Sequence, residues 1–118
     1  MWVSILSFTL DKIDFDHISH NTNPDILPFW EKHLDKLNWS VLSRNNNPSA
    51  IYLLQKYPEN IDWKFISMND GAMNIIQLNL HLINWSYFCS NKNAISILKQ
   101  YPEKYNFYYL CQNENAMS

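Results

Sequence analysis

Four side chains near the start of the chain are of kinds that bind metal ions. Asp14, Asp16, His17 and His20 are close in sequence, and Asp16 and His20 are four residues apart, which would place both on one helical face. A zinc site needs further His or Cys ligands at regular spacing, and this group has none and does not recur along the chain. The pattern therefore favours a solvated helix face, and we expect no metal ion and no cofactor.

The two cysteines are the other candidates for chemistry. A thiolate nucleophile needs an activating base, and no histidine recurs beside Cys89 or Cys111. Both cysteines occupy a position of a repeated phrase at which other copies have serine. Equivalent positions on packed helices are about 8–10 Å apart, whereas a disulfide requires Cα atoms within about 7 Å. We therefore expect two free thiols and an intracellular, reducing compartment.

The remaining composition excludes several classes of function. One glycine in 118 residues leaves no glycine-rich phosphate loop, and neither a hydrolase motif nor a catalytic pair of carboxylates is present. The net charge is −2 and most lysines are isolated, so the basic footprint of a nucleic-acid binder is missing. The apolar run at residues 1–10 is too short to span a bilayer. We expect a protein that is not an enzyme and has no nucleic-acid or membrane partner.

The elements that position these residues follow a phrase that occurs five times. It reads apolar, Asp or Asn, aromatic, two variable residues, apolar, Ser or Cys, one variable residue, Asn. The copies start near residues 13, 37, 61, 83 and 105, at intervals of 24, 24, 22 and 22 residues. Residues 1–12 match the second half of a repeat and form a partial N-terminal copy. A period in the twenties indicates a stacked repeat protein, so we expect residues 1–118 to form a single repeat domain.

Each repeat is predicted to form two short helices. The Asp or Asn before the aromatic residue is an expected N-cap, and the closing Asn tolerates the left-handed conformation that ends many helices. In the second half of the second repeat, Asn47 is an expected cap and Pro48 takes the first helical position. Pro28 falls inside the second helix of the first full repeat, where proline removes a backbone bond and makes this copy irregular. Because such short helices are marginal alone, the prediction is an all-α fold, a short α-solenoid of 22–24-residue helix-pair repeats.

Three columns of equivalent residues are predicted to hold the repeats together. The aromatic column is expected to fill the core, with a stacking platform for bases or sugars as the alternative. The closing Asn is expected to satisfy backbone groups where the helix ends and to bond between neighbouring repeats. The Ser or Cys position is expected to hold a small side chain at a contact within the scaffold. In chain order, the three columns contain Phe15, Trp39, Trp63, Trp85 and Phe107; Asn21, Asn45, Asn69, Asn91 and Asn113; and Ser19, Ser43, Ser67, Cys89 and Cys111.

The repeated phrase also carries a family resemblance. Ile/Leu-Asn/Asp-Trp-x-x-Leu/Ile-Ser-x-Asn, followed by Asn-Pro-Ser-Ala-Ile-Tyr-Leu-Leu, resembles short tandem repeats in proteins of large DNA viruses of algae and amoebae. The resemblance covers residues 13–118, although the third and fourth repeats lack the Asn-Pro pair. It implies a helical array that binds other proteins, located in the host cytoplasm or the virion.

Two positions in each first helix vary between repeats and are expected to face solvent. They follow the column aromatic by one and five residues, so each pair shares a helical face. We name this set the first-helix ribbon: Asp16, His20, Ser40, Arg44, Lys64, Met68, Ser86, Ser90, Tyr108 and Gln112. Fixed scaffold positions beside a variable surface favour a scaffold that mediates protein–protein interaction with an unknown protein partner. The alternatives are a structural component, such as a minor virion protein that self-associates through the ends of its array, or a solvated surface without a partner.

Overall fold

The computed structural model describes residues 13–116 and is all-α. Every regular element in that range is an α-helix or a 3₁₀ helix, so the prediction of an all-α protein is confirmed. The molecule is elongated, with principal dimensions of 54 × 25 × 19 Å. The partial repeat predicted for residues 1–12 lies outside the described residues.

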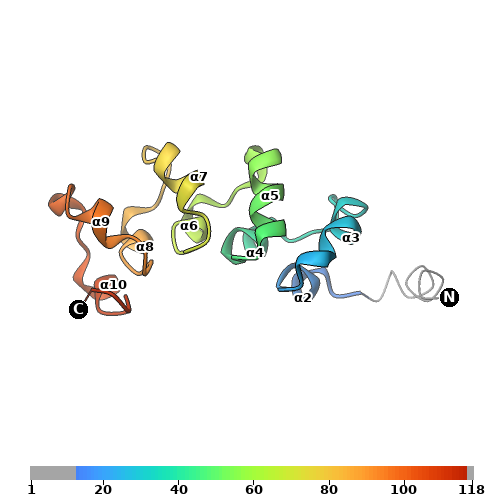
Figure 1. Ribbon diagram of the computed structural model, residues 1–118, viewed down its shortest axis with the longest axis horizontal. Coiled ribbons are helices and arrows are strands. Elements are labelled where there is room, and N and C mark those ends of the chain that lie inside the picture. Colours follow the sequence, from blue (N-terminus) through green and yellow to red (C-terminus); the bar gives the residue numbers. More distant parts are fainter. Residues whose placement is uncertain (1–12, 117–118) are drawn as a thin grey trace.

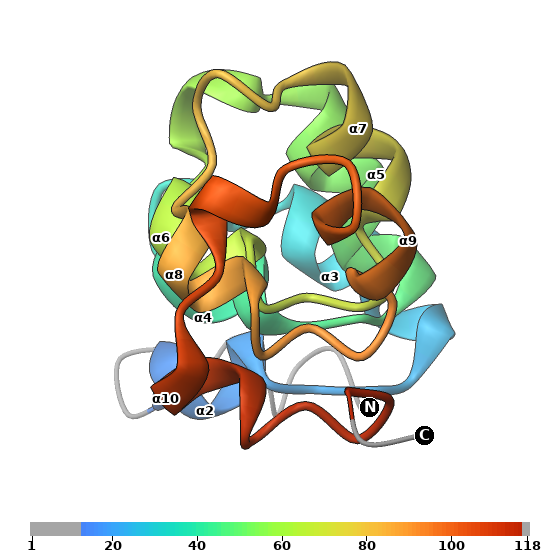
Figure 2. The same ribbon diagram turned by 90° about the vertical axis from the view of Figure 1, so that its left-hand side faces the viewer.

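The α-helices form two rows, as Figures 1 and 2 show. The first row contains α2 (Phe15–Ser19), α4 (Trp39–Arg44), α6 (Trp63–Ile66), α8 (Trp85–Phe88) and α10 (Phe107–Leu110). The second row contains α3 (Leu27–Glu31), α5 (Pro48–Lys56), α7 (Met73–Leu78) and α9 (Ile95–Leu98). Three 3₁₀ turns, each opened by proline, connect or precede helices at Pro24–Ile26, Pro58–Asn60 and Pro102–Lys104.

The first-row helices start where the sequence predicts. In each case the predicted Asp or Asn is the N-cap, and its side-chain oxygen accepts a hydrogen bond from a free amide of the first turn. Asn47 likewise caps α5, with Pro48 at its first position. The five confirmed first-row caps are Asp14, Asn38, Asp62, Asn84 and Asn106.

The serine column links each first-row helix to the next. The Ser43 hydroxyl donates to the Trp39 carbonyl (2.8 Å) and accepts from the backbone N–H of the next cap, Asp62 (2.9 Å). Ser19 and Ser67 make the same two bonds. The position is therefore more than the small contact that the sequence predicts, because its hydroxyl satisfies an amide of the following repeat.

The closing asparagines form a second link between repeats. The Asn69 amide nitrogen donates to the carbonyls of Ser43 (3.0 Å) and Asn45 (2.9 Å), and its oxygen accepts from the Gly71 N–H (2.9 Å). Asn45, Asn91 and Asn113 repeat this pattern, so the predicted bonding between neighbouring repeats is confirmed. The predicted left-handed conformation is wrong, since no residue from 13 to 116 has a positive φ.

The centre of the core is the aliphatic position three residues after each column aromatic. Leu42, Ile66 and Phe88 are 0% exposed there, packed with second-row residues. The column tryptophans are half-buried and pack against the two core clusters, whereas Phe107 is 76% exposed, so the prediction that the whole aromatic column fills the core is wrong at Phe107. An aromatic residue that directly follows the cap lies at the rim of its helix, where an indole N–H can still reach a carbonyl, as Trp39 Nε1 does to Leu34 (3.2 Å).

Pro28 does not interrupt a helix of the first full repeat, contrary to the prediction. Helix α3 begins at Leu27 after the turn Pro24–Ile26, so Pro28 sits in the first turn and interrupts no established helix. Trp30 of α3 is 0% exposed and belongs to the core, and its indole N–H donates to the Ile18 carbonyl (3.3 Å).

The only glycine of the sequence lies where two loops meet. A Cβ at Gly71 would lie 2.9 Å from the Asn46 Cβ and 3.1 Å from its carbonyl oxygen. Asn46 belongs to the preceding repeat, and its side chain bonds to Asp70, the neighbour of Gly71 (3.2 Å). Close approach of the loops, and not a special φ, accounts for the glycine.

Substituting Asn69 tests the asparagine links. Asn69→Ala leaves two buried carbonyls and one N–H without their partner, so we expect a loss of unfolding free energy of about 3 kcal/mol or more. Urea unfolding followed by circular dichroism measures it. Asn74→Ala, at an exposed position of α7, is the matched control and should change stability by under about 0.5 kcal/mol. Equal effects of the two substitutions would contradict the structural role.

Candidate functional site

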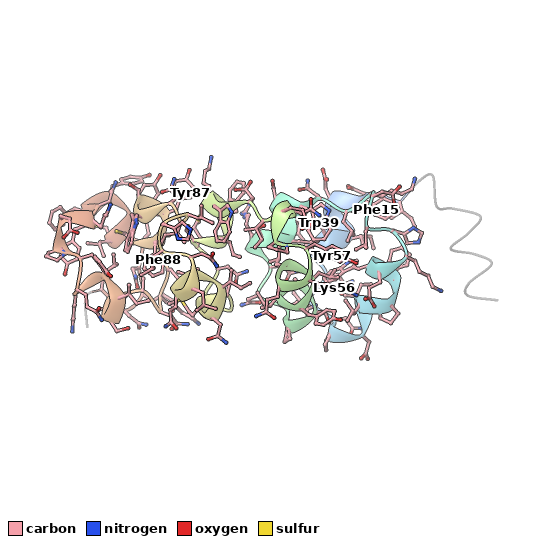
Figure 3. All side chains as sticks on the ribbon, turned by 90° about the horizontal axis from the view of Figure 1, so that it is seen from above. Phe15, Trp39, Lys56, Tyr57, Tyr87 and Phe88 are labelled. Atoms are coloured by element: carbon pink, nitrogen blue, oxygen red, sulfur yellow. The ribbon has the colours of Figure 1, made fainter. Side chains whose placement is uncertain are left out.

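The first-helix row presents the residues that the scaffold leaves free. Helix capping fixes where each short helix begins, and this places the residues one and five after the column aromatic on one side. Figure 3 shows the contrast between neighbouring side chains: Tyr87 lies at the outer edge of the molecule, whereas Phe88 points into the interior. The positions around Tyr87 are therefore the ones that a binding partner can contact.

The first-helix ribbon is exposed only in part. Seven of its ten residues are exposed, and Ser40, Ser86 and Ser90 are half-buried. The exposed members are Asp16, His20, Arg44, Lys64, Met68, Tyr108 and Gln112. Tyr108, with 70% of its surface exposed, is the most prominent aromatic member.

Some members of the ribbon serve the scaffold, which the sequence does not reveal. The Asp16 carboxylate accepts from the Asn38 side-chain amide (2.7 Å), and the Ser40 hydroxyl donates to the Asp62 carboxylate (2.8 Å). Ser86 is within 3.3 Å of the Asn106 amide in the same way. In three of the five copies the residue after the column aromatic thus binds the cap of the next repeat, so the view of this position as freely variable surface needs correction at Asp16, Ser40 and Ser86.

A row of aromatic rings beside the ribbon was missed from the sequence. Phe65, Tyr87 and Tyr109 occupy the position two residues after the column aromatic in the last three repeats. The Lys64 ammonium lies 5.3 Å from the centres of both the Phe65 and the Tyr87 rings, and the Arg44 guanidinium lies 5.0 Å from Phe65. Comparing this position across the copies, as for the columns, would have found it.

The rings continue toward the C-terminal end and form one surface with the two cations. The Tyr87 and Tyr109 ring centres are 5.0 Å apart, and Tyr108 meets Tyr109 edge-on at 5.1 Å. We name Arg44, Lys64, Phe65, Tyr87, Tyr108 and Tyr109 the cation–aromatic strip. A hydrogen bond with the Tyr87 hydroxyl, followed by desolvation, raises the pKa of Tyr109.

The histidines and acids near the start of the described chain do not form a common site. Asp14 caps α2 through the amides of Asp16 and His17, and Asp16 is bonded to Asn38. His17 and His20 line an open depression with residues 21–23. Residues 13–116 contain no group of three or more His, Cys, Asp or Glu side chains that could hold a metal ion.

The two cysteines are both free, as predicted, but their environments differ. Cys89 is buried and takes the place of the serine hydroxyl, with the Asn106 N–H 3.4 Å from its sulfur. Desolvation raises the pKa of the Cys89 thiol. Cys111 is exposed.

Comparisons of the chain with known proteins give no match. No family model, no curated protein and no solved structure matches it. The resemblance to viral tandem repeats therefore stays a prediction. Among the described residues no helix is long and apolar enough to cross a membrane.

The difference between the thiols can be measured by labelling. We expect a thiol reagent at neutral pH to modify Cys111 at least about tenfold faster than Cys89, since a buried thiol reacts only when the structure opens. Peptide mass mapping of a time course assigns the rates, and adding urea should equalise them. Labelling of both cysteines at one rate in the folded protein would contradict the burial of Cys89.

Replacing the buried thiol tests the serine position. Cys89→Ser provides an oxygen acceptor for the Asn106 N–H, and we expect a gain of about 0.5–1.5 kcal/mol at neutral pH. The folded pKa of Cys89 is raised, so the stability it contributes is complete below its unfolded pKa and is lost as the pH rises through the folded one. Unfolding at neutral and alkaline pH should show this loss for Cys89 and a smaller loss for the serine variant. An equal loss of unfolding free energy with rising pH in both proteins would contradict the raised pKa of the Cys89 thiol.

Proposed function

We propose that the chain is a short α-solenoid of 22–24-residue helix-pair repeats that binds a protein partner and has no enzymatic activity. The same pair of hydrogen bonds recurs from one repeat to the next, between residues 22 to 26 positions apart, and this recurrence supports the repeat architecture. An intracellular, reducing location, in a host cytoplasm or a virion, belongs to the same proposal; a reducing compartment keeps thiols such as Cys89 and Cys111 free.

The cation–aromatic strip is the single observation on which the binding function rests. The asparagine, serine and cap positions are engaged in bonds between repeats, so they cannot also recognise a partner. Arg44, Lys64 and Tyr108, in contrast, are exposed to solvent. Aromatic and arginine side chains are the residue types that dominate the energetics of protein interfaces.

The charges of the strip define the kind of partner. Arg44 and Lys64 are the two basic side chains of the strip, and the carboxylate of Asp62 beside them is bonded to the cap amides and to Ser40. The partner should therefore present carboxylates opposite the two cations and apolar or aromatic groups opposite the tyrosines. Two cations are few for a nucleic-acid backbone, whose binding rests on many phosphate contacts.

A pull-down with a triple variant tests the strip. The tagged chain is used to capture proteins from extracts of its native source, and we expect Arg44→Ala/Lys64→Ala/Tyr108→Ala to reduce capture of the partner at least about tenfold, as loss of interface anchors does. All three side chains are exposed, so the fold should be retained, which circular dichroism checks.

A second triple variant provides the matched control. Lys32→Ala/Lys36→Ala/Tyr52→Ala removes the same charges and one tyrosine from exposed positions away from the strip. It should capture the partner as well as the unmodified chain does. Equal capture by the strip variant and the unmodified chain would exclude the strip as the binding surface.

A structural or assembly role, for instance as a minor virion component, is the second candidate. It is favoured by one observation, an exposed apolar region where α9 and α10 meet.

A further inference from the structure

An apolar groove lies at the end of the two rows that carries α9 and α10 (Figure 1). Ile95 and Leu98 of α9 line it with Phe107 and Leu110 of α10, and Ala116 contributes as well. Its volume is 310 Å³. The lining is mostly apolar, and no residue between 13 and 116 covers it.

In the second and fourth repeats the equivalent positions are covered by a second-row helix and the tyrosine after it. Ile97 and Leu98 of α9 are buried in one cluster with Ile76 of α7 and Phe88 of α8. The ring of the column residue Trp85 lies 5.2 Å from that of Tyr101.

Trp39 and Tyr57 make the corresponding contact at 6.0 Å, and both are visible side by side in Figure 3. Phe107 is the equivalent of these tryptophans and is 76% exposed. The groove is therefore the place that one more second-row helix would occupy.

The chain contains a segment with the sequence of such a helix at its other end. Val3-Ser4-Ile5-Leu6 matches Ile95-Ser96-Ile97-Leu98, the sequence of α9. The match continues at the same spacing, because Asp11-Lys12-Ile13-Asp14-Phe15 corresponds to Glu103-Lys104-Tyr105-Asn106-Phe107. Residues 3–6 thus stand before Phe15 as α9 stands before Phe107.

The segment cannot reach the groove of its own molecule. Leu6 is seven residues before Ile13, and a fully extended chain of that length spans about 25 Å. Helices α2 and α10 are at opposite ends of a molecule 54 Å long, as Figure 1 shows. Only a second copy can bring residues 3–6 to the groove.

We propose that the groove between α9 and α10 binds residues 3–6 of a second copy, so that the chains associate head to tail. Such a contact uses two different surfaces and does not close on itself, so it generates open-ended assemblies. The inference deepens the assembly role and is independent of the cation–aromatic strip, since Arg44 and Lys64 take no part in the groove.

Sedimentation of the 118-residue chain over a range of concentrations tests the association. We expect the mean mass to rise with concentration, and both Phe107→Asp and Ile5→Asp to be monomers, because a buried carboxylate opposes each side of the contact. Leu78→Asp is the matched control: Leu78 is 81% exposed and outside the groove, so this variant should associate like the unmodified chain. The strip triple variant should also associate, which separates this test from that of the strip.

Mixing the two interface variants tests the head-to-tail arrangement. Ile5→Asp retains an intact groove and Phe107→Asp retains an intact segment, so an equimolar mixture should form a one-to-one dimer and no larger species. A monomeric unmodified chain, association of either variant alone, loss of association in Leu78→Asp, or a mixture that stays monomeric would each overturn the proposal.

A peptide covers the case in which Phe107→Asp does not fold. A labelled peptide of residues 1–12 should bind the unmodified chain by fluorescence anisotropy, and excess unlabelled peptide should displace it. Absence of binding by this peptide would overturn the proposal as well.

Discussion

The structure depends on one recurring interaction, in which an asparagine amide bridges two carbonyls of the preceding repeat. The helices are only four to nine residues long, and helices of that length do not hold together alone. Their ends leave many backbone groups without intrahelical partners. Asn45, Asn69, Asn91 and Asn113 are buried and satisfy these groups with both ends of the amide. Among the described residues, every buried side-chain nitrogen and oxygen has a partner.

Because the asparagine and serine links between repeats are polar and directional, they define which backbone groups of neighbouring repeats lie opposite each other. The Asn69 amide reaches the carbonyls of Ser43 and Asn45, and the Ser43 hydroxyl reaches the Asp62 N–H, only when the two repeats keep a fixed distance and orientation. The apolar core can then be narrow, with Leu42, Ile66 and Phe88 at its centre and the tryptophans at its rim. The same division leaves the outer face of the first-row helices free for Lys64 and Tyr87 to meet.

The described end of the two rows at α9 and α10 differs from the middle because each repeat packs against its neighbour. Asn113 bonds back to Cys89 and Asn91, so the last first-row helix is held as its predecessors are. Phe107 and Leu110, however, have no following second-row helix against them among the described residues. Helix α10 is therefore bonded to the preceding repeat, whereas no described residue packs on its apolar side, and the apolar groove results.

The sequence by itself determined the all-α fold, the five N-caps, the asparagine bonds between repeats and the two free thiols. These follow from local chemistry, because a cap or a closing asparagine acts on amides and carbonyls at fixed offsets along the chain. Only the tertiary structure decided that Leu42 rather than Trp39 is the core centre, that Ser40 binds Asp62, and that Lys64 lies against Phe65 and Tyr87. Each of these depends on how closely neighbouring repeats approach and at what angle, which the spacing of residues within one repeat does not specify.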